Sequence, residues 1–185
     1  MRNNQNKTKG FTLVETLVAI AILSVSLVSA FAAVQSSLQT TKFSQDRIAA
    51  YYLVQDAAEY VRNLRDENLI KGYDAAVKGS SWDWLSGISA QASDPCYFGK
   101  TCQVDVPAAT LSSCSGSWNS CNYLRQDTST GLFGYTSAWK TTVFKRELQF
   151  SQVSATEIKM TISISWTAGP LSRNLKVEQS LFNRI

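Results

Sequence analysis

The chain has 185 residues, of which 44% are hydrophobic and 17% are charged, with 18 basic and 14 acidic side chains. This length suits one membrane segment plus one modest globular domain, and the small positive charge indicates no general polyanion-binding surface. The chain contains no histidine, which excludes Ser-His-Asp and Cys-His catalysis and removes a common ligand of transition metals. We therefore expect no enzymatic activity, no cofactor and no metal site.

The first 34 residues read as a short basic leader and a membrane span. Residues 1–10 contain Arg2, Lys7 and Lys9 and no acid, and residues 11–34 are apolar or small apart from Glu15 and a few hydroxyl side chains. At about 1.5 Å per residue, residues 11–34 form a helix of roughly 36 Å, which is long enough to cross a bilayer. The position of the basic residues predicts a cytoplasmic N-terminus at the plasma (inner) membrane, with the rest of the chain outside.

The helical pattern continues beyond the membrane span. Residues 35–68 form an amphipathic helix in which apolar residues recur at steps of three and four, namely Ala50, Leu53, Val54, Ala57, Val61 and Leu64. This spacing predicts one helix that continues to about Asn68. Lys71 and Gly72 then resemble a C-terminal helix end.

Residues 69–140 are a variable region that contains all four cysteines. The mixture of aromatic residues with Gly, Ser, Asn and Asp predicts loops pinned by short elements. The even number and short spacings of Cys96, Cys102, Cys114 and Cys121 favour two disulfides, formed in an oxidising compartment, over a zinc site. Three pairings are possible, of which Cys96–Cys102 with Cys114–Cys121 closes the shortest loops.

Residues 141–185 change to a period of two, which is typical of β-strands. In "EIKMTISISW" one face carries only apolar residues, and the segments "VFKRELQF" and "NLKVEQSL" alternate in the same way. Because the connectors are short, we expect an antiparallel meander. Its apolar face needs a cover, which the amphipathic half of the helix can supply. The predicted fold class is α+β, with one long helix packed on a C-terminal antiparallel sheet.

Two groups of side chains are candidates for a binding surface, one adhesive and one for nucleic acid. Tryptophans in loop-like sequence form either an adhesive surface or the core of the domain, and we expect the core for Trp82, Trp84 and Trp118. Basic residues occur along the predicted strands, namely Lys140, Lys145, Arg146, Arg173 and Lys176. Because acids are interspersed among them, we expect a solvated strand face rather than a nucleic-acid site.

The segment "KGFTLVETLVAIAIL", residues 9–23, resembles the class III signal of type IV pilins and of the pseudopilins of type II secretion. The resemblance implies that a membrane-embedded prepilin peptidase cuts after Gly10 and methylates the new amine of Phe11. Glu15 matches the family's acidic fifth mature residue. The long helix, the disulfide region and the C-terminal sheet also resemble the pilin architecture. The apolar helix would then stay in the membrane until pilus assembly machinery packs it with other pilin subunits in a cell-surface or periplasmic filament.

Glu15 is costly if it lies within hydrocarbon, at about 2.5–3.5 kcal/mol on insertion scales. It follows Phe11 by one helical turn, so after cleavage its carboxylate can pair with the new amine of its own or a neighbouring subunit. The simpler alternative is an interfacial acid that extends out of the membrane. The adjacent Lys-Gly-Phe-Thr-Leu sequence favours the charge pair, which gives Glu15 a role in assembly.

The family resemblance leaves several functions open. Major pilins commonly have a proline midway along this helix, and residues 28–34 contain none, which indicates a minor pilin with a priming, tip or adhesion role. One alternative is a minor pseudopilin of a type II secretion system. Another is a secreted disulfide-bonded domain with a conventional signal peptide cleaved between Ala32 and Ala33.

Overall fold

The structure is a computed structural model and describes residues 10–79, 82–169 and 171–183. The predicted leader therefore lies outside the described residues, apart from Gly10. The chain divides into two units, Met1–Gln45 and Asp46–Ile185. A single helix, α1 (Leu13–Val77, 65 residues), contributes to both units.

In the first unit, α1 is long and apolar enough to cross a membrane, and the side chains of its most apolar window are not buried within the protein. The hydroxyl groups of this segment donate to carbonyl oxygens one turn earlier: Ser24 to Ile20 and Ser26 to Ile22, both at 2.8 Å. These bonds satisfy the hydroxyls within the helix itself. That arrangement lowers the free-energy cost of placing them in lipid.

Helix α1 ends at Val77, so the predicted end at Asn68 is wrong. Gly72 lies inside the helix, where a glycine costs only about 1 kcal/mol relative to alanine. The residue that ends the helix is Gly79, which has a φ of 74° and whose N–H donates to the carbonyl of Ala76. Glycine commonly occupies this position, two residues after the last helical one, because it adopts the left-handed conformation without steric cost.

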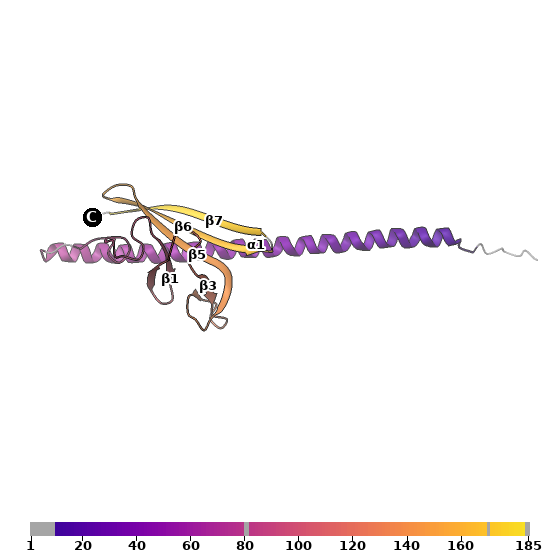
Figure 1. Cartoon of the computed structure of the whole chain (residues 1–185), viewed down its shortest axis with the longest axis horizontal. Helices are drawn as coiled ribbons and strands as arrows, with labels where there is room; N and C mark the ends of the chain where they lie inside the picture. Colours follow the sequence, from indigo (N-terminus) through magenta and orange to yellow (C-terminus); the bar gives the residue numbers. More distant parts are fainter. Residues whose placement is uncertain (1–9, 80–81, 170, 184–185) are drawn as a thin grey trace, which may run out of the picture. The chain divides into compact units, whose positions relative to one another are not determined.

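Among the described residues, the second unit contains a seven-stranded sheet in which every pairing is antiparallel. Strands β5 (Lys140–Gln152), β6 (Glu157–Ala168) and β7 (Leu171–Phe182) form the predicted meander. Strand β5 also pairs with β1 (Thr101–Asp105) near its C-terminal end and with β3 (Tyr123–Gln126) near its N-terminal end. In Figure 1 these three long strands run along the C-terminal half of α1. Two shorter strands complete the sheet: β2 (Thr110–Ser113) pairs with β1, and β4 (Phe133–Gly134) pairs with β3.

The core lies between α1 and the inner face of this sheet, which confirms the predicted α+β fold. From the helix it takes Ala50, Leu53, Val54, Ala57, Ala58 and Val61. From β6 it takes the whole predicted apolar face, Ile158, Met160, Ile162, Ile164 and Trp166. The small residues Ala50 and Ala57 of the helix are fully buried.

Arg146 corrects the sequence interpretation, because this arginine is fully buried in the core and not solvated. It shares the inner face of β5 with Phe144, Leu148 and Phe150, as period-two alternation requires. Its guanidinium donates to the Asp56 carboxylate and to the carbonyls of Leu53 and Val104. A buried charge is tolerated because it has these partners.

The variable region contains the four short strands β1–β4 together with turns and loops. The cysteines form Cys96–Cys102 and Cys114–Cys121, which is the pairing that closes the shortest loops. The first disulfide is fully buried and ties the start of β1 to the preceding turn. The second closes the loop between β2 and β3.

Candidate functional site

The start of α1 is organised by Thr12 and Glu15. The Thr12 backbone N–H and hydroxyl donate to Glu15 Oε2 at 2.8 and 2.9 Å, and the Glu15 N–H donates back to the Thr12 hydroxyl at 3.3 Å. This reciprocal pattern is a capping box, in which a threonine and a glutamate three residues later satisfy each other's backbone N–H groups. A carboxylate in the first turn also suits the positive end of the helix dipole.

The predicted cleavage bond lies just outside this cap. Gly10 and Phe11 precede α1, both are exposed, and the Phe11 side chain is 84% accessible. In the intact chain the nitrogen of Phe11 is an amide, and the Glu15 carboxylate is bonded to Thr12. Its pairing with a Phe11 amine concerns the cleaved chain and stays a prediction. The capping role is one that the sequence interpretation missed, although the Thr-x-x-Glu spacing signals it.

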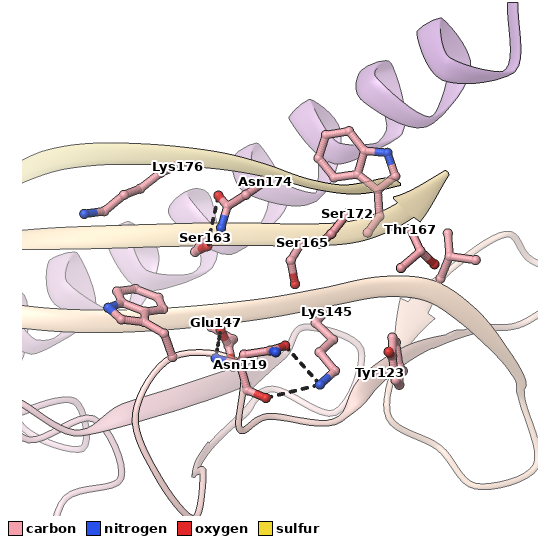
Figure 2. Close-up of a pocket in the computed structure, with 13 residues that line it drawn as sticks. Asn119, Tyr123, Lys145, Glu147, Ser163, Ser165, Thr167, Ser172, Asn174 and Lys176 are labelled. Atoms are coloured by element: carbon pink, nitrogen blue, oxygen red, sulfur yellow. Dashed lines mark hydrogen bonds between the residues drawn. The ribbon is translucent and has the colours of Figure 1, made fainter. Parts of the chain in front are cut away.

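A polar groove lies on the outer face of the sheet, opposite the side that packs on α1. It has a volume of about 440 Å³ and extends across β5, β6 and β7 to the loop before β3. In Figure 2, Ser163 and Ser165 of β6 lie between Lys145 and Glu147 of β5 and Asn174 and Lys176 of β7. Alternation places these side chains together, because each is one residue away from an inward-facing position.

Glu147 holds one wall of the groove in place. The residue is only 3% exposed, and its two carboxylate oxygens accept the N–H groups of Asn119 at 2.7 Å and Cys121 at 3.0 Å. Lys145 Nζ donates to the carbonyl and side-chain oxygens of Asn119, both at 3.2 Å. The Glu147 carboxylate and the Lys145 ammonium group thus both attach the loop closed by Cys114–Cys121 to β5.

Asn119 has a φ of 72°, one of two positive values among the described non-glycine residues. A residue in this region costs more than an extended one, although asparagine tolerates it best. The hydrogen bonds from Lys145 and to Glu147 stabilise Asn119 in this conformation. The neighbouring Trp118 is thereby held beside the groove.

Two lysines of the groove lie against aromatic rings. Lys145 Nζ is 4.7 Å from the centre of the Tyr123 ring, and Lys176 Nζ is 6.0 Å from that of Trp118. Both distances suit cation–π attraction. Lys176 also forms a surface ion pair with Glu178 at 3.4 Å, as does Lys159. The Lys145–Tyr123 and Lys176–Trp118 pairs thus each place an ammonium group beside an aromatic ring in the groove.

The tryptophans and basic residues considered in the sequence analysis lie in different environments in the structure. Trp84 belongs to the core as predicted, but that prediction is wrong for Trp82 and Trp118, which are exposed. Of the five basic residues, only Lys145 and Lys176 line the groove, and Arg146 faces the opposite side. The sequence interpretation missed the groove. Its signal was the run of hydroxyl and amide side chains on the polar face of β6 and β7.

Comparison with known proteins identifies the N-terminal segment. Residues 5–31 match the family model of the prokaryotic N-terminal methylation motif. No curated protein and no solved structure matches the chain. The motif implies processing by a prepilin peptidase and assembly by pilin machinery, and the apolar helix behind it fits membrane anchoring. The N-terminal segment therefore carries the prepilin signal found in type IV pilins and pseudopilins, and a capped apolar helix and a pilin-like α+β layout accompany it.

Proposed function

We propose that this protein is a minor pilin, which a prepilin peptidase cleaves after Gly10 and methylates at Phe11. The observation that carries the proposal is the methylation motif at residues 5–31, which leads directly into α1. The mature chain is then a structural subunit with no catalytic activity of its own. Before assembly it lies in the inner membrane with its N-terminus in the cytoplasm, and afterwards in a surface or periplasmic filament.

The apolar surface of α1 supports a two-stage use of the helix. Large apolar side chains from Leu13 to Leu38 are more than half exposed. Lipid can cover this surface before assembly, and the same segments of neighbouring subunits can cover it afterwards. Because both surroundings are apolar, extraction into a filament core need not expose it to water for long.

Glu15 is proposed to change partners during this process. In the intact chain it completes the cap with Thr12. Cleavage after Gly10 creates a positively charged amine at Phe11, one turn away. The carboxylate can then bind that amine or the amine of an adjacent subunit, and a charge pair inside an apolar filament core is stronger than one in water.

A minor role is favoured over a major one by the absence of proline from residues 28–34, since a midway proline is common in major pilins. The pseudopilins of type II secretion share the same signal. Electron microscopy with antibodies against this chain tests the assignment. We expect sparse labelling, at a tip or at isolated points along a surface filament. Dense labelling along the whole filament would contradict the minor role.

The processing step is tested by the mass of the mature protein. We expect a chain that begins at Phe11 and carries one methyl group on its terminal nitrogen. A mature chain beginning at Ala33 would instead show a conventional signal peptide and would overturn the assignment. Deleting the prepilin peptidase should leave only the full-length precursor, which gives the matched control.

A further inference from the structure

We propose that the groove across β5, β6 and β7 binds an acidic saccharide, meaning a sugar unit that carries a carboxylate. Such a site would give the proposed minor pilin an adhesive function, and to that extent the inference rests on the proposed function. Its volume of about 440 Å³ lies within the range of small-molecule sites, about 300–1,000 Å³.

The charge of the groove favours an anion. Lys145 and Lys176 contribute two ammonium groups, and Glu147 is the acid among the lining residues. Both oxygens of Glu147 already accept backbone N–H groups, so this carboxylate is not available to repel or bind a ligand. Glu178, which lies outside the groove, forms an ion pair with Lys176 at 3.4 Å. The Lys176 ammonium group has three N–H donors, so it can bind a second carboxylate.

The hydrogen-bonding groups suit a polyhydroxylated ligand. Ser163 and Asn174 bond each other at 3.1 and 3.3 Å. Among the described residues, the hydroxyls of Ser165, Thr167 and Ser172 have no protein hydrogen-bond partner, and all three line the groove. A hydroxyl both donates and accepts, as sugar hydroxyls do. The groove therefore offers several adaptable partners around a few fixed charges.

Aromatic and apolar surface is also exposed within the groove. Trp118, Tyr123 and Val143 are 36%, 45% and 41% exposed, and all three line the groove. An aromatic ring with an apolar body and a polar edge is suited to a ligand with both kinds of surface. A pyranose ring has such surfaces, because its C–H groups form apolar patches between its hydroxyls.

The groove is pre-organised. Disulfide Cys114–Cys121, the buried Glu147 carboxylate and Lys145 hold the loop that carries Trp118 and Asn119. Asn119 keeps a positive φ within it. Strain held by surrounding contacts is characteristic of functional sites, and rigidity reduces the entropy that a site loses on binding.

A single-stranded nucleic acid is the main competing ligand, because it also combines negative charge with stacking surfaces. Such binding uses a groove whose basic residues track a series of phosphates, with rings open for stacking. Here the groove has two lysines, and each lies over one of the two exposed rings. A single carboxylate with neighbouring hydroxyls matches this arrangement better.

The test uses the full chain in detergent on an array of saccharides that end in glucuronate, galacturonate or sialate, each beside its neutral counterpart. We expect the chain to bind an acidic member at least about tenfold more tightly than its neutral counterpart, as expected when one charged hydrogen bond is gained. Lys176→Gln and Trp118→Ala should each weaken this binding by about tenfold. Lys140→Gln, an exposed lysine of β5 outside the groove, is the matched control and should bind normally.

Competition by an oligodeoxythymidine decides between the two ligand classes. If this oligonucleotide binds the groove and acidic saccharides do not displace it, the site is a nucleic-acid site and the proposal is overturned. Absence of binding to every saccharide at millimolar concentration, while Phe11 is processed normally, would overturn the inference but not the pilin assignment. Unchanged binding by both Lys176→Gln and Trp118→Ala would also overturn it. Retained binding by Trp118→Phe would show that the aromatic surface, and not merely a folded loop, is required.

Discussion

The buried guanidinium of Arg146 lies 2.7 Å from the carboxylate of Asp56, and this ion pair connects the centre of β5 to α1. The Arg146 side chain is 0% exposed, whereas that of Asp56 is 41% exposed. Two backbone carbonyls, of Leu53 and Val104, also accept from the arginine. One cation thus joins the helix, β1 and β5, at a place where the remaining inner-face residues of β5 are apolar.

Loss of this pairing should destabilise the second unit. We expect Asp56→Asn to lower the free energy of unfolding by about 1–3 kcal/mol, because the Arg146 charge would stay buried with neutral acceptors only. Urea unfolding of the full chain in detergent, followed by tryptophan fluorescence, measures this. Glu67→Gln is the matched control on the same helix, where an exposed pair with Lys71 is worth at most about 1 kcal/mol. Equal midpoints for the two variants would show that the buried pair has no special weight.

Glu147→Gln should loosen the loop between β2 and β3. The carboxylate accepts the N–H groups of Asn119 and of the buried Cys121. A glutamine has one carbonyl oxygen, so one of these two N–H groups loses its partner, at a cost of up to about 1–3 kcal/mol where that group is buried. We expect faster hydrogen exchange at Asn119 and Cys121 and faster reduction of the Cys114–Cys121 disulfide. Glu157→Gln removes a charge from β6 and should change neither rate at this loop. Unaltered exchange in Glu147→Gln would contradict the role assigned to Glu147.

Substitutions at Thr12 and Glu15 separate the cap from the charge pair. Glu15→Gln keeps an acceptor for the Thr12 N–H but has no charge, so we expect normal cleavage and loss of the subunit from sheared filaments. Thr12→Ala keeps the charge and weakens the cap by about 1 kcal/mol, so we expect cleavage and incorporation. Immunoblots of membranes and filaments give both readouts. Normal incorporation of Glu15→Gln would leave the capping box as the function of Glu15.

Gly10→Ala should block processing while the fold stays intact. A Cβ built at Gly10 meets no atom within 4 Å, so the structure itself accommodates alanine. The expected block therefore reflects the peptidase, and the full-length precursor should accumulate in membranes with both disulfides formed. Gly79→Ala is a control at an exposed glycine with positive φ, where we expect some strain and normal cleavage. Efficient cleavage of Gly10→Ala would remove Gly10 from the proposed cleavage site.

Alkaline pH should weaken the domain through Tyr135. Burial raises the pKa of the Tyr135 hydroxyl from 10.0 to about 12, and this hydroxyl donates to the Arg146 carbonyl at 3.4 Å. Because the unfolded chain loses this proton first, the stabilising contribution is complete below about pH 10 and falls by roughly 2 kcal/mol as the pH rises to about 12. Unfolding midpoints across this range should decline more steeply for the natural chain than for Tyr135→Phe. Parallel declines would show that Tyr135 titrates normally.

Sequence periodicity predicted most of the second unit, because alternation along β5 and β6 depends only on neighbouring residues. The inner face of β6 is buried as predicted. The same alternation places Arg146 on the inner face of β5, but its charge suggested solvent. Its partner Asp56 lies 90 residues earlier in the chain, and no local pattern connects the two.

At the C-terminal end of α1, by contrast, a local sequence signal predicted the wrong position for the helix end. Lys71 and Gly72 have the composition of a helix terminus, yet five further residues continue α1 to Val77. A glycine ends a helix only where the backbone adopts a left-handed conformation, and here that residue is Gly79. Composition around Gly72 could not distinguish these two positions.

The sequence by itself determined the methylation motif, the apolar start of α1, the Thr12–Glu15 spacing and the strand alternation. Each depends on residues within a few positions of one another, so local chemistry is sufficient. The tertiary structure decided the ion pair of Arg146 with Asp56, the support of Asn119 by Glu147, and the gathering of Lys145, Lys176 and Trp118 around one groove. These features depend on strand order and loop placement, which bring distant residues together through packing of the whole domain.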